Sequence, residues 1–321
     1  MARDNRTLGR FHLEGIPALQ GLIEAGAPIQ AVLTLRPDVA ATRSGAADYR
    51  SLCQRFGVPL HEIVHINDAA SRELLKSLAL DVVFVIGWSQ LLAPETLRTA
   101  RVGMIGAHAS LLPRNRGSAP INWVLIRGEP ASGNSLIWLA ESVDAGDLID
   151  QTEFPITPYD TCASLYDRVA ASNRDMILRV LPRLLAGERP GKPQPRHSGP
   201  VLARRRPADG LIVWDQDASA VYNFVRALTK PYPGAFSWLD GRRWIVWQAA
   251  LLPSNGAPPS GAVPGTVLGP LQSPLRDACG QVVACAHGAV ALLEIVADDG
   301  EVLRGSRLSE QPWTGRRWTN G

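Results

Sequence analysis

The sequence predicts an α/β fold with a doubly wound, mostly parallel sheet, followed by a small β-barrel. Three observations support this fold class. Strand-like and helix-like apolar patterns alternate through the first half of the chain, as in doubly wound sheets. Residues 82–86 are all apolar, which is typical of a central parallel strand covered on both faces. The last third contains short apolar runs between Gly- and Pro-containing turns, a pattern typical of small barrels.

The first half can be assigned element by element. Gly57 is expected to end a helix, because glycine at a helix C-terminus adopts a left-handed conformation without strain. No G-x-G-x-x-G sequence opens a helix after a strand, so a dinucleotide site is not implied. Strands are expected at residues 29–35, 58–63, 82–86 and 135–139, and helices at 46–56, 68–78, from about 120, and from about 160 to 185.

The chain is expected to change character between residues 187 and 207, which are rich in Pro, Gly and Arg. We therefore expect a catalytic domain (1–188), a linker (189–207) and a C-terminal domain (208–321), with limited proteolysis cutting first in the linker. Three consecutive arginines, 204–206, are either a solvated run or a contact for a phosphate-bearing substrate. In the last domain we expect a helix at 218–228, a hairpin turning at Asp240-Gly241, and strands at 265–268, 281–286 and 290–296.

Composition limits the possible functions. The chain has 321 residues, of which 45% are hydrophobic, and this is typical of a globular protein with a large core. A net charge of +3 gives no electrostatic case for obligatory nucleic-acid binding. Four cysteines without a C-x-x-C pair indicate a reducing compartment and packing roles, with a Cys279–Cys285 disulfide as the minor alternative. We expect no metal site, membrane span or signal peptide, and take the cytoplasm as the default location.

The candidate chemistry lies in residues 105–147. His108 follows an apolar run at the expected carboxyl end of a strand, where open α/β sheets bind ligands. Asp144 and Asp147 lie in an expected tight turn. Histidine exchanges protons near neutral pH, and a neighbouring carboxylate raises its basicity. His108 and Asp144 are therefore a candidate general acid–base pair, with a packed histidine and a turn-forming aspartate as the alternative.

These residues belong to longer motifs. HxSLLPxxRGxAPxxW begins at His108, SxDAGD contains Asp144, and VRALTKPYPGAFSW follows at residues 225–238. Together they resemble the folate-dependent formyltransferases, which include methionyl-tRNA formyltransferase, glycinamide ribonucleotide transformylase and the sugar N-formyltransferases. The resemblance extends over most of the chain. It is strongest to the branch that acts on UDP-4-amino-4-deoxy-L-arabinose.

The resemblance implies a function. A formyl group would pass from N10-formyltetrahydrofolate to a primary amine, most simply on a nucleotide-linked amino sugar, with His108 taking the proton of the amine and Asp144 assisting it. It also implies that the C-terminal barrel is OB-like. Trp88 is either a pocket aromatic or a packing residue. The implied donor contacts are Gln90, Leu91, Leu92, Ala140, Glu141, Ser142 and Val143, and the candidate substrate contacts are Ser110, Arg116 and Trp88.

Two positions depart from the family pattern. Gly106 stands where the family has an asparagine that helps to hold the formyl oxygen, and Ser118 stands where it has a folate-contacting arginine. Loss of one such oxygen-holding donor costs about 10²–10³ in rate. Gly106 is expected to leave space that a water, a backbone N–H or a side chain such as Asn122 could enter.

Two alternative functions stay open. Methionyl-tRNA as acceptor is disfavoured, because the loop expected to face tRNA carries only Arg36 and Arg43. A binding or regulatory homologue that has lost catalysis is supported by Gly106. The identity of the acceptor and the oligomeric state are not determined by the sequence.

Overall fold

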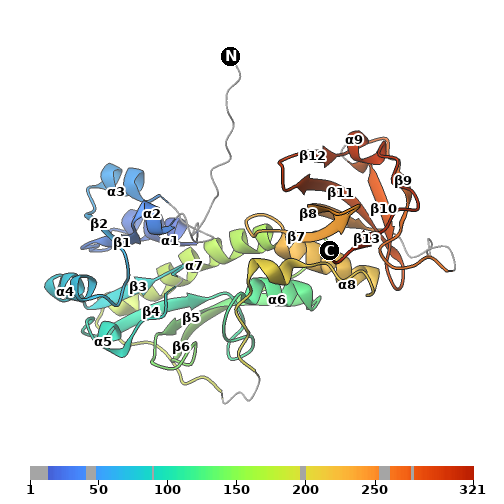
Figure 1. Ribbon diagram of the computed structural model, residues 1–321. Helices are drawn as coiled ribbons and strands as arrows, with labels where there is room; N and C mark the ends of the chain where they lie inside the picture. Colours follow the sequence, from blue (N-terminus) through green and yellow to red (C-terminus); the bar gives the residue numbers. More distant parts are fainter. Residues whose placement is uncertain (1–13, 41–47, 89, 196–199, 253–260, 276–277) are drawn as a thin grey trace. The chain divides into compact units, whose positions relative to one another are not determined.

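The computed structural model describes residues 14–40, 48–88, 90–195, 200–252, 261–275 and 278–321 (Figure 1). The chain groups into two compact units. The first unit comprises residues up to 120, 131–156 and 164–203, and the second comprises 121–130, 157–163 and 204–321. The expected domain boundaries, with a linker at 189–207 between two separately folding parts, stay a prediction.

Two features are absent from the described residues. None of their helices combines the length and apolar character needed to cross a membrane. In the same part of the chain, no group of three or more His, Cys, Asp or Glu side chains is arranged to hold a metal ion.

The first unit contains parallel and antiparallel strand pairs. Strands β1 (Val32–Leu35) and β2 (Leu60–Ile63) pair in parallel. A second sheet has the order β3-β4-β5-β6, in which β3 and β4 are parallel and the remaining pairs are antiparallel. Its strands are β3 (Val82–Val85), β4 (Gly103–His108), β5 (Ala131–Trp138) and β6 (Leu148–Pro155). The predicted α/β fold class is confirmed.

Helices cover both faces of the second sheet. Successive residues of a strand point to opposite faces, so neighbouring residues pack against different helices. Ile105 of β4 packs in a core cluster with Met176 and Ile177 of the long helix α7 (Cys162–Leu185). Its neighbour Met104 packs in a different cluster, with Leu75 of α4. The other helices of the first unit are α1 (Gly15–Glu24), α2 (Pro37–Ala40), α3 (Arg50–Phe56), α4 (Ala69–Ser77) and α5 (Pro94–Leu97).

The second unit is built on a curled antiparallel sheet of order β13-β7-β8-β11-β10-β9, with β12 paired to β11. The predicted hairpin is present: Asp240 and Gly241 connect β7 and β8 with φ values of 52° and 76°, as a type I′ turn requires. Closure of the sheet into an OB-like barrel stays a prediction. The elements are α6 (Pro120–Ile126), α8 (Ala218–Leu228), β7 (Ala235–Leu239), β8 (Arg242–Leu251), β9 (Val267–Leu271), β10 (Gly280–Ala284), β11 (Ala289–Ala297), β12 (Val302–Arg304), α9 (Ser306–Ser309) and β13 (Trp318–Thr319).

Three tryptophans lie close together in the interior of the second unit. The rings of Trp214 and Trp313 each lie 6.1 Å from that of Trp318 between centroids. Among the three consecutive arginines, Arg205 lies over the rings of Trp123 and Phe224, while the other two are exposed. All four cysteines are free and buried, so the alternative of a Cys279–Cys285 disulfide is wrong.

The predicted linker contacts the first unit over much of its length. Lys192 pairs with Leu148 through two backbone hydrogen bonds of 2.8 and 2.9 Å. Leu202 N donates to Arg116 O at 2.7 Å, and Leu202 O accepts from Ser118 N at 3.0 Å. We call residues 189–195 and 200–203 the strap. The strap belongs to the first unit by its contacts.

Candidate active site

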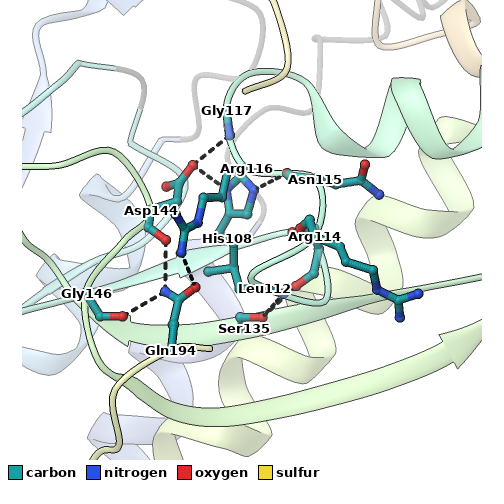
Figure 2. Close-up of polar contacts among 11 residues, drawn as sticks. His108, Leu112, Arg114, Asn115, Arg116, Gly117, Ser135, Asp144, Gly146 and Gln194 are labelled. Carbon is teal, nitrogen blue, oxygen red and sulfur yellow. Dashed lines mark hydrogen bonds and ion pairs between the residues drawn. The ribbon is translucent and has the colours of Figure 1, made fainter. Parts of the chain in front are cut away.

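His108 and Asp144 lie side by side at the carboxyl end of β4 (Figure 2). His108 is the last residue of the strand, and Asp144 lies in the turn that precedes β6. The Nδ1 atom of His108 is 3.5 Å from Oδ2 of Asp144, and their side chains are only 10% and 18% exposed. The two residues that the sequence indicated as an acid–base pair therefore face each other at ion-pair distance.

The hydrogen bonds around this pair define which nitrogen carries the proton. His108 Nε2 lies 2.8 Å from the carbonyl oxygen of Asn115, and since a carbonyl can only accept, Nε2 donates. Nδ1 is then the ring nitrogen that faces Asp144. Asn115 adopts φ 56°, a left-handed conformation that asparagine tolerates better than most residues. Gly117 N donates to Asp144 Oδ2 at 2.9 Å and fixes the carboxylate (Figure 2).

Ser110 and Ser135 support the loop that follows His108. Ser110 Oγ donates to Arg114 O at 2.8 Å, and Ser135 Oγ donates to Ser110 O at 2.6 Å. Leu112 N donates to Ser135 Oγ at 3.1 Å. The hydroxyl of Ser110, a candidate substrate contact, is thus buried and engaged in the loop itself.

A glutamine of the strap forms hydrogen bonds with both the turn that contains Asp144 and the loop that contains Arg116. Gln194 Nε2 donates to Asp144 O at 2.9 Å and to Gly146 O at 2.7 Å. Arg116 Nη2 donates to Gln194 Oε1 at 3.1 Å (Figure 2). Sequence reasoning missed Gln194 because it lies in a segment read as linker. Its flanking prolines, Pro193 and Pro195, were the only local signal.

The expected donor-binding residues 90–92 differ in their surroundings. Gln90 is buried, and its amide accepts from Ile66 N at 2.8 Å and donates to Val64 O at 3.2 Å. Leu91 is 74% exposed, whereas Leu92 packs against a core cluster. A ligand at this loop would therefore meet the side chain of Leu91 and the backbone of Gln90.

Trp88 and the run from Ala140 to Val143 complete the candidate contacts. Trp88 packs against the same core cluster as Leu92, and its buried Nε1 has no hydrogen-bond partner in the described part of the chain. The run from Ala140 to Val143 is exposed, and Glu141 lies 3.4 Å from Arg98. An exposed run directly before Asp144 is available to a ligand.

Gly106 does not leave the open space that we expected. It is buried on β4, two residues before His108 and therefore on the same strand face. A Cβ atom at Gly106 would lie 2.5 Å from Cδ2 of Leu139, so Leu139 fills the position. Asn122, the side chain that we expected to enter this space, belongs to the second unit, where its Nδ2 donates to Ala227 O at 2.6 Å.

Three solved structures share this fold. HypX from Aquifex aeolicus, in complex with tetrahydrofolic acid, is 21% identical with a TM-score of 0.62, covering 87% of this chain and 46% of HypX. The chain thus spans about half of HypX. WlaRD, a sugar 3N-formyl transferase crystallised with dTDP and 5-N-formyl-THF, is 13% identical with a TM-score of 0.61, covering 88% of this chain and 95% of WlaRD. Methionyl-tRNA formyltransferase from Clostridium thermocellum is 18% identical with a TM-score of 0.54, covering 86% of this chain and all (100%) of that enzyme.

Family membership comes from the sequence itself. Residues 25–181 match the formyl transferase family, and residues 205–311 match the formyl transferase C-terminal domain. The first match contains His108 and Asp144, and the second contains most of the curled sheet. Neither match includes the strap. The chain belongs to the formyl transferase family.

Proposed function

We propose that this chain transfers a formyl group from N10-formyltetrahydrofolate to the primary amine of a nucleotide-linked amino sugar. The observation that carries this proposal is the orientation of His108, whose Nδ1 faces Asp144 while Nε2 is held by Asn115. Family membership supplies the reaction class. The acid–base pair would carry the proton that the acceptor amine loses to the departing nitrogen.

The proton balance of formyl transfer fits this arrangement. When the acceptor nitrogen bonds to the formyl carbon it must lose one proton, and the departing nitrogen must gain one. Nδ1 of neutral His108 would take the first proton, and the facing carboxylate of Asp144 would stabilise the resulting imidazolium. Return of the same proton to the departing nitrogen leaves the pair unchanged after each turnover.

The surroundings also fit a folate donor. The donor supplies a formyl group already attached to a nitrogen leaving group. Its contacts would come from the Gln90 backbone, Leu91, Leu92 and the exposed run from Ala140 to Val143. The buried Nε1 of Trp88 and Nε of Arg116 have no partner among the described residues, and each can donate to acceptor atoms of a ligand.

A nucleotide sugar is favoured over tRNA as acceptor for two reasons. The net charge of +3 provides little attraction for the many phosphates of tRNA. WlaRD, a sugar formyltransferase solved with a nucleotide, also has the higher TM-score, 0.61 against 0.54 for methionyl-tRNA formyltransferase.

One observation favours a second candidate, a homologue that binds the same ligands without transfer. Leu139 fills the place beside Gly106, so an apolar side chain lies where an oxygen-holding amide would act. Formyl transfer by this chain then requires another donor to the formyl oxygen, such as a backbone N–H or a water.

A direct assay separates these functions. The protein is incubated with N10-formyltetrahydrofolate and a panel of UDP- and dTDP-linked amino sugars, and mass spectrometry detects the mass gain of one formyl group. We expect turnover with at least one amino sugar. Faster formylation of charged initiator methionyl-tRNA would replace the sugar acceptor. No transfer with any acceptor, together with a rise in melting temperature on adding folate, would identify a binding homologue.

A further inference from the structure

The strap lies outside both family matches, yet it contacts the candidate active site. The two matches end at residue 181 and resume at 205. Between them, the backbone of Lys192 pairs with Leu148 at the start of β6, and that of Leu202 pairs with the chain on both sides of Gly117. The strap is thus attached on both sides of the His108–Asp144 pair.

Gln194 lies between these two attachments in the sequence, and both its amide nitrogen and its amide oxygen form hydrogen bonds there. Its two N–H groups donate to Asp144 O and Gly146 O, and its oxygen accepts from Arg116. Only a neutral amide combines two donors and an acceptor in this way. Pro193 and Pro195 fix their own φ angles and restrict the residues before them, which lowers the entropy lost when Gln194 binds.

Asp144 receives such a support. Its backbone φ is 51°, in the left-handed region that residues other than glycine adopt infrequently. The amide of Gln194 holds the carbonyl of this residue, and Gly117 N holds its carboxylate. Gln194 also binds Arg116, the residue directly before Gly117.

We propose that Gln194 is a positioning residue that fixes the Asp144 carboxylate opposite Nδ1 of His108. Its catalytic consequence rests on the proposed formyl transfer. Its structural consequence, the placement of Asp144 against the imidazole, does not depend on the acceptor or on turnover.

Two substitutions separate the contacts of Gln194. Gln194→Met keeps the length and removes all three hydrogen bonds. Gln194→Glu keeps an acceptor for Arg116, so the strap stays attached, but it cannot donate to Asp144 O or Gly146 O. The matched control is Lys192→Ala, because the described contacts of Lys192 use only its backbone and its side chain is exposed.

Kinetics provide the first readout. A displacement of about 1 Å in a catalytic group can cost about 10²-fold in rate. We expect both Gln194 variants to lower kcat by about 10- to 100-fold with little change in KM, while Lys192→Ala behaves as wild type. Because Gln194 acts through Asp144, Gln194→Met should add little to the loss already caused by Asp144→Asn.

Imidazole NMR provides a second readout that needs no substrate. In Gln194→Met and Gln194→Glu, the side-chain ¹⁵N signals of His108 should move towards those of Asp144→Asn, with melting temperatures that show each protein to be folded. Unchanged His108 signals in both folded variants would overturn the proposal. If wild type transfers no formyl group but the His108 signals move as expected, the proposed function fails and the positioning role stands.

Discussion

The two units differ in how far some of their facing charged groups are withdrawn from solvent. In the second unit, the exposed arginines at the start of β8 are paired: Arg242 with Asp299 and Glu301, and Arg243 with Asp298. In the first unit, Nδ1 of His108 faces Asp144 at the end of β4, and the two side chains are only 10% and 18% exposed.

This difference indicates where the chemistry lies. A surface whose charges are mutually neutralised has little left to offer a ligand, and such exposed pairs contribute little to stability. A histidine that faces a carboxylate away from solvent is instead suited to proton transfer. We therefore propose that catalysis lies in the first unit, and we expect the paired arginines of the second unit to be replaceable.

The largest expected effect is loss of transfer in His108→Ala. General acid–base catalysis contributes about 10²–10⁴ in rate, so kcat/KM should fall by that factor. Arg242→Ala, which breaks a solvent-exposed charge cluster in the second unit, is the matched control and should retain wild-type turnover. Near-normal activity in His108→Ala, or an equal loss in Arg242→Ala, would remove the distinction between the two units.

The next effect concerns stability. Trp318 is 1% exposed and packs against Trp214 and Trp313, so Trp318→Ala should destabilise the protein by about 3–5 kcal/mol. Denaturant unfolding measures this change. Tyr159→Ala, at a residue 90% exposed, should stay within about 0.5 kcal/mol. Equal losses at the two positions would show that the tryptophan cluster is not the core that the structure indicates.

A smaller effect is expected at Gly106. Gly106→Asn forces its Cβ against Leu139 and should cost about 1–3 kcal/mol of stability without raising transfer. Adding Leu139→Ala makes room for the amide, and if a missing oxygen donor limits the rate, transfer should rise towards 10²–10³-fold. Calorimetry and formyl-transfer kinetics on both variants test this. Higher activity in Gly106→Asn alone, at unchanged stability, would show that the Leu139 side chain moves aside without a measurable cost in stability.

The smallest effect is a lack of reactivity. Burial raises the pKa of Cys162 and of Cys285 to about 12, so both thiols are neutral at pH 8. Thiolates react with iodoacetamide and thiols do not, so neither residue should be alkylated in the folded protein at that pH. Mass mapping with and without guanidinium measures this. Rapid labelling of either residue in the native protein would contradict the assigned burial.

Local patterns predicted most of the fold. The Asp240-Gly241 turn, the α8 helix and the C-terminal glycine of α3 follow from residue preferences within a few positions, and the structure confirms them. Part of the predicted helix at 46–56 lies outside the described residues, and α3 itself begins at Arg50. The His108–Asp144 juxtaposition was accessible from sequence because both residues belong to recognisable motifs.

Contacts between distant segments were not accessible in this way. The sequence showed that Gly106 lacks an amide, but not that Leu139, which follows the antiparallel neighbour β5, occupies its place. Gln194 and Asp144 lie 50 positions apart, and no periodicity or spacing connects them. Composition identified the strap as a linker because prolines and glycines serve both free linkers and segments laid along a surface.

The position of Gln194 in the chain has a consequence for biosynthesis. The ribosome makes His108, Gly117 and Asp144 well before it makes the strap, since Gln194 follows Asp144 by 50 residues. A nascent chain that has emerged only as far as α7 contains His108 and Asp144 without the amide of Gln194. Under the proposed positioning role, the candidate site is complete only after Gln194 has left the exit tunnel and bound Asp144 O and Gly146 O.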